Sequence, residues 1–278
     1  MQTINLIGFA GGAAANNVDC ALGPWYWYYH PELFNQLDVK VNWRKMVHYT
    51  SNLHGIFVKE ELFEALQELE QAVAKNLKSD KTMLVLGGDH SCAMGTWQGV
   101  AKALNQPFGL IWIDAHLDSH TPEDSSSKNF HGMPMAYLLG LWGDRGILNP
   151  ESVCVVGGRS YESEELANLQ RLGVKMMLMQ EVKQKGIEAT LKECVQHIQK
   201  QTHHIGLSID FDAFSPKDAP GVGCPEPMGL DFQKFLNALE KMKYPWLMYE
   251  LAEFNPLRDK HHKTADCLPR FLQAILSK

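Results

Sequence analysis

The segment FGLIWIDAHLDSH (108–120) joins an apolar run to a strict alternation of acids and an imidazole. Residues 108–113 are almost all apolar, which is typical of a strand covered on both faces of a parallel sheet. Asp114, His116 and Asp118 follow at every second position, and on an extended chain such side chains share one face. Because open parallel sheets bind ligands beyond the carboxyl ends of their strands, the segment predicts a parallel sheet with a polar site at its edge.

Other apolar runs predict the rest of this sheet, and amphipathic segments predict helices between them. The expected strands lie at 4–10, 82–88, 152–158, 174–179, 204–212 and 246–254. The expected helices, with apolar residues spaced by three and four, lie at 59–77, 187–201, 231–242 and 264–278. Strands that alternate with helices predict an α/β sheet with crossover connections.

The composition is that of an ordinary globular protein and excludes several classes of function. Of the 278 residues, 45% are hydrophobic and 21% are charged. The net charge of -6 and the lack of a Lys/Arg run argue against a nucleic-acid partner. No stretch reaches the roughly 18 apolar residues that a membrane span needs, so we expect no membrane partner. Length alone suggests about two domains, but the candidate site residues come from the whole chain, so we expect a single domain over 1–278.

The N-terminus and the cysteines predict a cytoplasmic protein. The N-terminal MQTINLIGFAGG lacks a basic segment and has only a short apolar run, so it is expected to form a first strand rather than a signal peptide. The six cysteines show no CxxC spacing, which favours reduced and mostly buried thiols in a cytosolic protein.

The alternating acids indicate a metal site. Neighbouring carboxylates repel one another, and a divalent cation removes that conflict. Mixed Asp and His ligands suit manganese, zinc or iron better than calcium, while a turn or helix cap is the alternative explanation. A second pair, Asp210 and Asp212 in SIDFDAFSP (208–216), ends another apolar run. Four carboxylates and an imidazole are too many for one ion and suit two ions that share carboxylates.

Two further segments bring polar groups to strand ends. LVLGGDHS (84–91) ends at His90, and its glycine pair permits a tight turn with close backbone approach. In YELAEFNP (249–256), Glu250 and Glu253 interrupt an apolar run. A buried glutamate needs a partner, and a cationic group of a substrate is one candidate for both.

Five motifs in order resemble those of the ureohydrolases, the family of arginases, agmatinases, guanidinobutyrases and formiminoglutamases. They are GGDHS (87–91), DAHLD (114–118), NFHGMP (129–134), SIDFDAFSP (208–216) and ELAEFNP (250–256), and the resemblance runs from about residue 4 to the C-terminus. It implies a three-layer α/β/α sandwich with a mostly parallel central sheet. It also implies hydrolysis of a guanidino group to urea and an amine, and a homo-oligomer, either a trimer or a hexamer.

The same resemblance implies two manganese ions, although Asp/His ligation also admits iron, cobalt or nickel. The ligands of one ion would be His90, Asp114, Asp118 and Asp210. The ligands of the other would be Asp114, His116, Asp210 and Asp212, with Asp114 and Asp210 bridging.

The chemistry of guanidine hydrolysis assigns roles to further residues. Guanidinium is a resonance-stabilised cation and a poor electrophile, so two metal ions would supply hydroxide from a bridging water. His131 is the candidate general acid or proton shuttle, because imidazole titrates near neutral pH. Glu253 would orient the planar guanidinium, which matches a carboxylate bidentately. Asp118 is expected to be a catalytic residue, like His131 and Glu253, as well as a metal ligand.

The polar segment SHTPEDSSSKNFHG (119–132) bears on the substrate. It resembles the arginase loop that binds the amino-acid head group, with matches that include Ser127 and Asn129. His120 stands where that family usually has Asn, and Lys128 where it usually has Gly. Ser127, Asn129 and Lys128 would offer donors to an α-carboxylate, and a polar surface loop is the alternative.

A second departure lies in GGRSYESEE (157–165), where Glu162 aligns with an aspartate that arginases use near the α-amine. Glu162 would accept from an ammonium, so His120, Ser127, Asn129 and Glu162 are the expected substrate-binding residues. L-arginine is the expected guanidino substrate, and agmatine, guanidinobutyrate and formiminoglutamate are the alternatives.

Three other classes remain to be weighed. GFAGGAAA (8–15) lacks the GxGxxG spacing of a dinucleotide loop. A one-metal deacetylase would leave His90, Asp118 and Asp212 without a role. A non-catalytic binding protein would be expected to have lost at least one of the six ligand positions, all of which hold competent residues. Cys224, where a threonine is usual, is expected to be inert, with oxidation sensitivity as the alternative.

Overall fold

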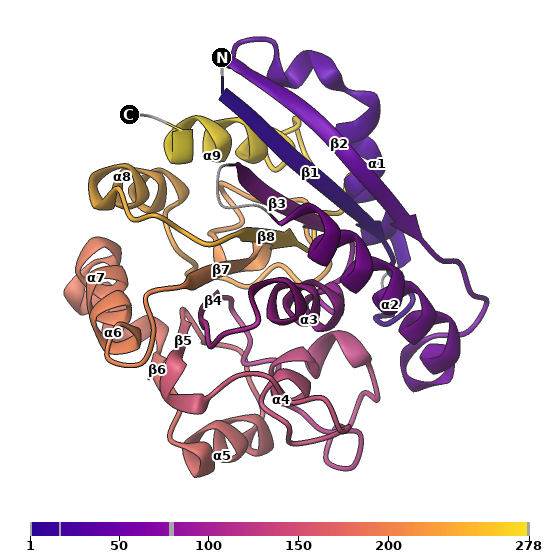
Figure 1. The fold of residues 1–278 in the computed structure, drawn as a ribbon, viewed down its shortest axis with the longest axis vertical. Helices are drawn as coiled ribbons and strands as arrows, with labels where there is room; N and C mark the ends of the chain where they lie inside the picture. Colours follow the sequence, from indigo (N-terminus) through magenta and orange to yellow (C-terminus); the bar gives the residue numbers. More distant parts are fainter. Residues whose placement is uncertain (1, 17, 78–80, 277–278) are drawn as a thin grey trace.

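The structure is a computed structural model that describes residues 2–16, 18–77 and 81–276. Eight strands form one sheet in the order β2-β1-β3-β8-β7-β4-β5-β6, and every neighbouring pair is parallel (Figure 1). The strands are β1 (Gln2–Ala10), β2 (Val39–His48), β3 (Thr82–Gly87), β4 (Gly109–Ile113), β5 (Val153–Val156), β6 (Lys175–Met177), β7 (Ile205–Asp210) and β8 (Tyr249–Ala252).

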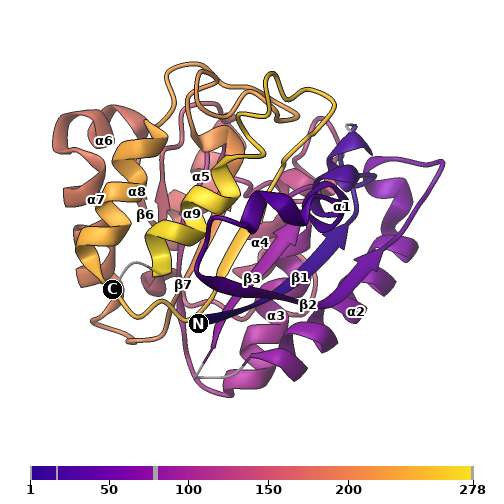
Figure 2. The same cartoon turned by 90° about the horizontal axis from the view of Figure 1, so that it is seen from above.

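Helices cover both faces of the sheet. They are α1 (Leu22–Tyr29), α2 (Lys59–Asn76), α3 (Cys92–Leu104), α4 (Pro134–Leu138), α5 (Ser163–Leu172), α6 (Met179–Lys185), α7 (Ile187–Ile198), α8 (Phe232–Met242) and α9 (Cys267–Leu276). Figure 2 shows α7, α8 and α9 on one side of the molecule and α2 on the other, with strands between them. Within the described residues, no helix combines the length and the apolar composition that a membrane crossing requires.

The alternation of side chains along the strands creates two cores. In β4, Ile111 and Ile113 pack with α7, α8 and α9, whereas Leu110 and Trp112 pack with α2 and α3. All four side chains are fully buried. Burial on both faces explains why the strand is a continuous apolar run. The three-layer α/β/α sandwich predicted from the sequence is therefore confirmed.

The sequence did not predict six elements, and the physical reason is clear for two of them, β2 and α3. The others are helices α1, α4, α5 and α6. Strand β2 lies at the sheet edge, where it pairs only with β1, and most of its side chains are at least partly exposed. An edge strand needs no continuous apolar run, so its sequence VKVNWRKMVH carries a weak signal. Helix α3 is buried from Cys92 to Val100 without interruption. A helix that is buried all round lacks the polar face on which periodicity depends.

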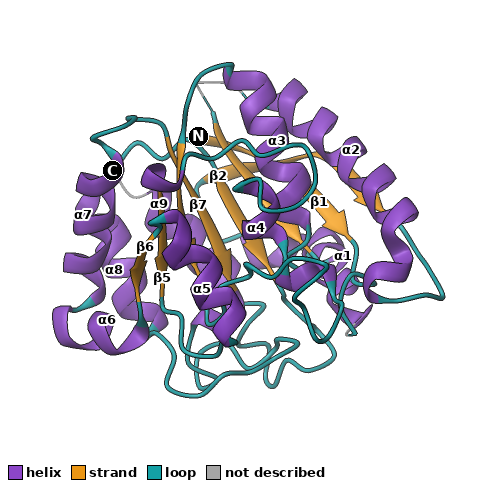
Figure 3. Cartoon of the chain, turned by 90° about the horizontal axis from the view of Figure 1, so that it is seen from below, coloured by secondary structure: helices purple, strands orange, loops and turns teal. Residues whose placement is uncertain are grey.

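The central strands carry the candidate residues. Strands β3, β8, β7 and β4 are consecutive neighbours in the sheet, and polar residues follow the end of each one. Figure 3 shows the long loops gathered beyond one end of the strands. Parallel strands that are adjacent end at a common edge, so residues far apart in sequence meet there.

Candidate metal centre and active site

His90 reaches the sheet edge through the turn that follows β3. The Gly88 amide donates to the Phe9 carbonyl at 2.7 Å, and a Cβ at Gly88 would collide with the carbonyl oxygen of Gly11. This close approach confirms the role expected for the glycine pair. The His90 ring stacks on Trp112 with centroids 4.0 Å apart, which fixes the plane of the imidazole.

A first group of ligand atoms surrounds the Nδ1 atom of His90. Nδ1 lies 3.1 Å from Asp114 Oδ2, 3.2 Å from Asp118 Oδ2 and 3.4 Å from Asp210 Oδ2. The side chains are almost completely buried, although they come from the ends of three different strands. His90, Asp114 and Asp210 are spaced closely enough to hold one cation.

A second group is centred on His116. Its Nδ1 atom lies 3.1 Å from Asp212 Oδ2 and 3.4 Å from Asp114 Oδ1. Asp114, His116 and Asp212 form another candidate cation site, so Asp114 belongs to both groups through different oxygens. The structure thus brings together all six residues expected as metal ligands.

Asp114 and Asp210 each have a role in a local turn as well as a place in a ligand group, so the two explanations given for the alternating acids are compatible. Asp114 Oδ1 accepts from the His116 amide at 2.7 Å, and Asp210 Oδ1 accepts from the Asp212 amide at 2.7 Å. Each aspartate therefore closes a local turn with one oxygen and presents the other to His90. The sequence suggested that Asp114, His116 and Asp118 share one face of an extended strand, and this is wrong. Strand β4 ends at Ile113, and Asp118 has a left-handed φ of 49°, so turns rather than strand alternation bring these side chains together.

The electrostatics of the two groups favour bound cations. Burial and the charge of Asp114 raise the pKa of Asp118 to about 7. Burial and Asp212 raise the pKa of Asp210 well above its usual range. Burial opposes a charge on His90 and His116, but the surrounding carboxylates raise the pKa of both imidazoles well above the ordinary value. Carboxylates and imidazoles crowded in this way need positive charge between them, and divalent cations, which take oxygen and imidazole ligands, fit these positions.

Glu250 supports His90 from behind and does not face a substrate. The Nε2 atom of His90 lies 3.0 Å from Ser208 Oγ, which donates to Glu250 Oε1 at 2.8 Å. Trp97 Nε1 donates to the same oxygen at 3.1 Å, and Glu250 is fully buried. The expectation that a substrate cation would pair with Glu250 is therefore wrong, because protein groups already satisfy this carboxylate.

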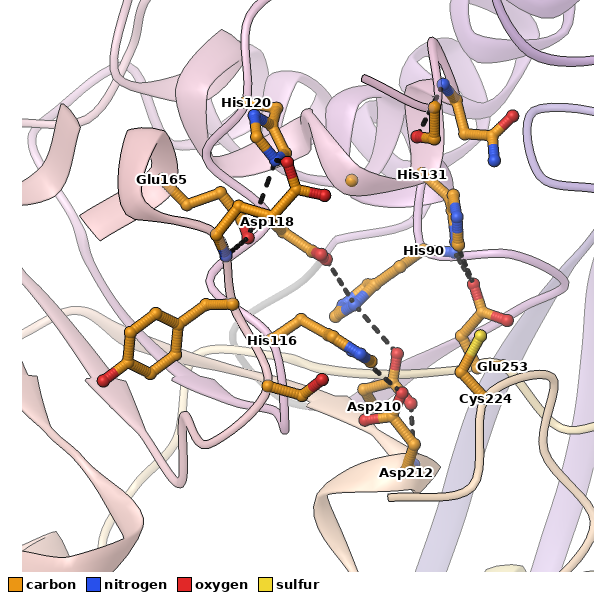
Figure 4. Close-up of a pocket in the computed structure, with 16 residues that line it drawn as sticks. His90, His116, Asp118, His120, His131, Glu165, Asp210, Asp212, Cys224 and Glu253 are labelled. Atoms are coloured by element: carbon orange, nitrogen blue, oxygen red, sulfur yellow. Dashed lines mark hydrogen bonds and ion pairs between the residues drawn. The ribbon is translucent and has the colours of Figure 1, made fainter. Parts of the chain in front are cut away.

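A cavity of about 380 Å³ opens above the two groups. Its walls are formed by His90, His116, Asp118, His120, Ser127, Asn129, His131, Gly132, Ser160, Tyr161, Glu162, Glu165, Asp210, Asp212, Cys224 and Glu253. Figure 4 shows His131 and Glu253 on one side of this cavity and His120 and Glu165 on the opposite side. Every expected metal ligand and catalytic residue except Asp114 lines the cavity, and Asp114 is completely buried.

His131 and Glu253 form a pair in the wall of the cavity, where Glu253 is buried and His131 is partly exposed. The Nδ1 atom of His131 lies 3.2 Å from Glu253 Oε1. Burial alone would lower the pKa of His131, but the hydrogen bond and charge of Glu253 raise it to about 9. Burial alone would raise the pKa of Glu253, but His131 lowers it overall. The pair therefore consists of an imidazolium and a carboxylate at neutral pH.

The rim of the cavity carries the residues expected to bind a substrate head group. The Nδ1 atom of His120 lies 2.9 Å from Asp124 Oδ1, and its Nε2 atom lies 3.5 Å from Glu162 Oε2. Ser127 and Asn129 also line the rim. Lys128 does not, because its ammonium donates to the Pro122 carbonyl at 2.6 Å and so is held within the loop.

Sequence reasoning missed three residues at the site. Tyr161 and Glu165 line the cavity, and Glu165 also accepts from the Glu162 amide at 2.9 Å in a capping box at the start of α5. An acid three residues after a helix cap is a signal that could have located Glu165. Cys20, which donates to Glu253, had no signal because it lies in a four-residue 3-10 helix outside every motif. Cys224 lines the cavity and is exposed, and desolvation raises the pKa of its thiol to about 11. Its expected inertness stays a prediction.

Comparison with known proteins identifies the class to which this fold and site belong. The chain superimposes on solved ureohydrolases over its whole length. The arginase of Bacillus subtilis covers 100% of this chain and 99% of its own, with a TM-score of 0.88 at 29% identity. The arginase of Entamoeba histolytica, solved in complex with L-ornithine, gives a TM-score of 0.90 at 25% identity and covers 100% of this chain and 99% of its own.

Sequence comparison then gives the family. The model of the Arginase family matches residues 4–277. The arginase of Bacillus caldovelox is 37% identical over 212 residues, which cover 73% of this chain and 71% of that protein. The arginase of Bacillus subtilis is 33% identical over 254 residues, which cover 87% and 83%. The chain belongs to the arginase family of hydrolases.

Proposed function

We propose that this protein hydrolyses L-arginine to L-ornithine and urea with two bound manganese ions. The observation that carries the proposal is the sharing of Asp114 by two cation sites beneath a cavity that also presents Glu253. Relatives with the name arginase at 37% and 33% identity support the choice of substrate. We also propose that residues 1–278 act as one catalytic domain in a cytoplasmic homo-oligomer.

The two ligand groups account for the metals. His90, Asp114, Asp118 and Asp210 would hold one ion, and Asp114, His116, Asp210 and Asp212 would hold the other. When bound, such a pair of cations supplies hydroxide near neutral pH by lowering the pKa of water.

The remaining residues bind the substrate and move protons. Glu253 would accept the planar guanidinium of arginine and orient its carbon toward the ligand groups. After attack by hydroxide at that carbon, the bond to the side-chain nitrogen breaks and ornithine leaves as an amine. His131, protonated at neutral pH, would deliver the proton that this amine takes up. At the rim, Ser127 and Asn129 would donate to the α-carboxylate.

His120 and Glu162 complete the head-group site. His120 is held by Asp124, so one ring nitrogen remains for the substrate carboxylate or for Glu162. Glu162 is more than half exposed at its side chain and would accept from the α-ammonium. A site that pairs with both the α-carboxylate and the α-ammonium would favour an α-amino acid over a guanidino compound that lacks either charge.

Urea release from a panel of guanidino compounds tests this proposal. The manganese-loaded protein is expected to release urea from L-arginine, and Asp118→Ala or His90→Ala is expected to remove most of this activity. Asp38→Ala, which alters an exposed carboxylate away from the cavity, is the control and should keep it. Turnover of agmatine or guanidinobutyrate in place of arginine would refute the substrate while sparing the class. A protein that hydrolyses none of them refutes the proposal.

A further inference from the structure

We propose that Cys20 is a positioning residue that fixes the carboxylate of Glu253 for recognition of the guanidinium group. The inference rests on the proposed function and extends it to a residue outside every motif of the site. Cys20 lies in the short 3-10 helix Val18–Ala21 before α1, and its side chain is fully buried. Its thiol does not line the cavity, so it would act through Glu253 rather than by contact with a substrate.

The contacts of Glu253 show why a further support matters. Oε1 accepts from the His90 amide at 2.9 Å and lies 3.2 Å from His131 Nδ1. Oε2 accepts from the Cys20 thiol at 3.2 Å. One oxygen is thus held by residues on the metal side, and the other is held by the N-terminal segment. Since a carboxylate accepts about four hydrogen bonds and three are already made, one lone pair remains, on Oε2, for a donor of the guanidinium.

The backbone at Glu253 does not by itself direct the side chain. Glu253 follows β8 with a left-handed φ of 68°, which non-glycine residues adopt infrequently. Such a conformation persists only where the surroundings hold it. The Cys20 thiol also lies 3.7 Å from the Glu253 carbonyl oxygen, and Trp27 of α1 stacks on Phe254 with centroids 4.4 Å apart. Cys20 and Trp27 therefore hold the chain at Glu253 through contacts with its carboxylate, with its carbonyl group and with the next residue.

The thiol is a donor throughout the physiological range. Burial and the charge of Glu253 raise the pKa of Cys20 well above its ordinary value. A protonated thiol donates to the carboxylate without neutralising it, so Glu253 keeps its charge for a cationic group. A lysine or arginine at the same place would compete with the guanidinium for that charge. Cys20 thus combines orientation of the carboxylate with preservation of its charge.

The test compares variants that keep or remove the donor. Cys20→Ala and Cys20→Val remove it, and valine also fills the space of the thiol. Cys20→Ser keeps a donor. Cys194→Ala, at a fully buried cysteine of α7 remote from the cavity, is the matched control for loss of a core thiol. Each manganese-loaded protein is assayed for urea release from L-arginine, and calorimetry gives the Kd values of guanidinium chloride and L-ornithine.

The donor-free variants are expected to raise the KM for arginine and the Kd of guanidinium about tenfold, which corresponds to about 1.4 kcal/mol. Because the same contact is present before and during reaction, kcat should change less than threefold. Ornithine lacks the guanidino group, so its Kd should stay within twofold. Cys20→Ser should recover most of the guanidinium affinity, and Cys194→Ala should match the unaltered protein.

Two outcomes overturn the inference. One is a guanidinium Kd in Cys20→Val within twofold of the unaltered protein. The other is equal weakening of guanidinium and ornithine binding without recovery in Cys20→Ser, which indicates general damage to the fold. These outcomes can be distinguished from failure of the proposed function, in which the unaltered protein would release no urea from arginine. Guanidinium calorimetry on the manganese-loaded protein still tests Cys20 in that event.

Discussion

Binding of divalent metal is expected to release protons, and the number can be worked out from the ligand groups. In the metal-free protein, carboxylates raise the pKa of His90 and His116 well above the ordinary value, so both imidazoles carry a proton at pH 7. An imidazole must be neutral, and a carboxylate must be ionised, before it can bind a metal ion. Both imidazoles must therefore lose a proton when two cations bind.

The carboxylates add to this number. The pKa of Asp118 is about 7, and that of Asp210 is raised well above its usual range. Two cations should therefore displace about two to four protons at pH 7. The overall binding constant then rises by a factor of at least about 100 per pH unit, or about 2.7 kcal/mol, since one pKa unit corresponds to 1.36 kcal/mol.

Calorimetry checks this directly. Manganese is titrated into metal-free protein at pH 7 in buffers of different ionisation enthalpy, and the slope of the observed enthalpy gives the number of protons released. His116→Asn should lower that number by about one. His197→Asn, at a histidine of α7 whose pKa is lowered by burial, should leave it unchanged. A release of fewer than one proton per chain, or a binding constant that is constant from pH 6.5 to 7.5, would refute the reasoning.

Other predictions concern single side chains. Ser208→Ala removes the partner of His90 Nε2 and should weaken manganese binding about tenfold by metal titration; unchanged affinity would contradict this. The pKa of His131, about 9, lies above the ordinary value of about 6.5. Its stabilising effect of about 3 kcal/mol is therefore complete below pH 6.5 and lost as pH rises through 9. Urea unfolding of metal-free protein should show this loss, and His131→Asn should reduce it; equal slopes in both proteins would count against it. Glu162→Gln should raise the KM for arginine about tenfold and leave turnover of guanidinobutyrate, which has no amine, unchanged; equal effects on both would exclude an amine contact.

The sequence predicts strands that are buried on both faces and helices that have one buried and one exposed face. Strand β4 is buried on both faces, so its apolar run is unmistakable, and the same holds for β1 and β3. Strand β2 has one free edge and helix α3 has no free face, so neither shows the pattern expected of its type. Signals based on periodicity depend on a contrast between two sides, and these elements lack it.

The site divides in a similar way. Asp114 and His116 were found because short spacings bring them together locally, and His90 was found because its motif and a glycine turn mark it. Cys20 contacts Glu253 across 233 positions of the chain, from a 3-10 helix of four residues that is too short to show periodicity. Glu250 was misplaced because the sequence shows that two glutamates interrupt the apolar run 246–254 but not which one faces Ser208. The pairing register of β7 and β8, which sets Ser208 opposite Glu250, distinguishes the two glutamates and cannot be derived from the sequence.

The local turns explain how the ligand groups take shape in the absence of metal. Asp114 and Asp210 each satisfy a backbone amide two residues later, so the chain already gains a hydrogen bond from the conformation that presents the second oxygen to His90. Trp112 adds a donor to Asp114 at 2.9 Å and a stacked ring behind His90. Because backbone and aromatic contacts already fix these directions, we expect a bound cation to replace protons more than it rearranges side chains. The ligands would then be ordered during folding rather than on cation binding.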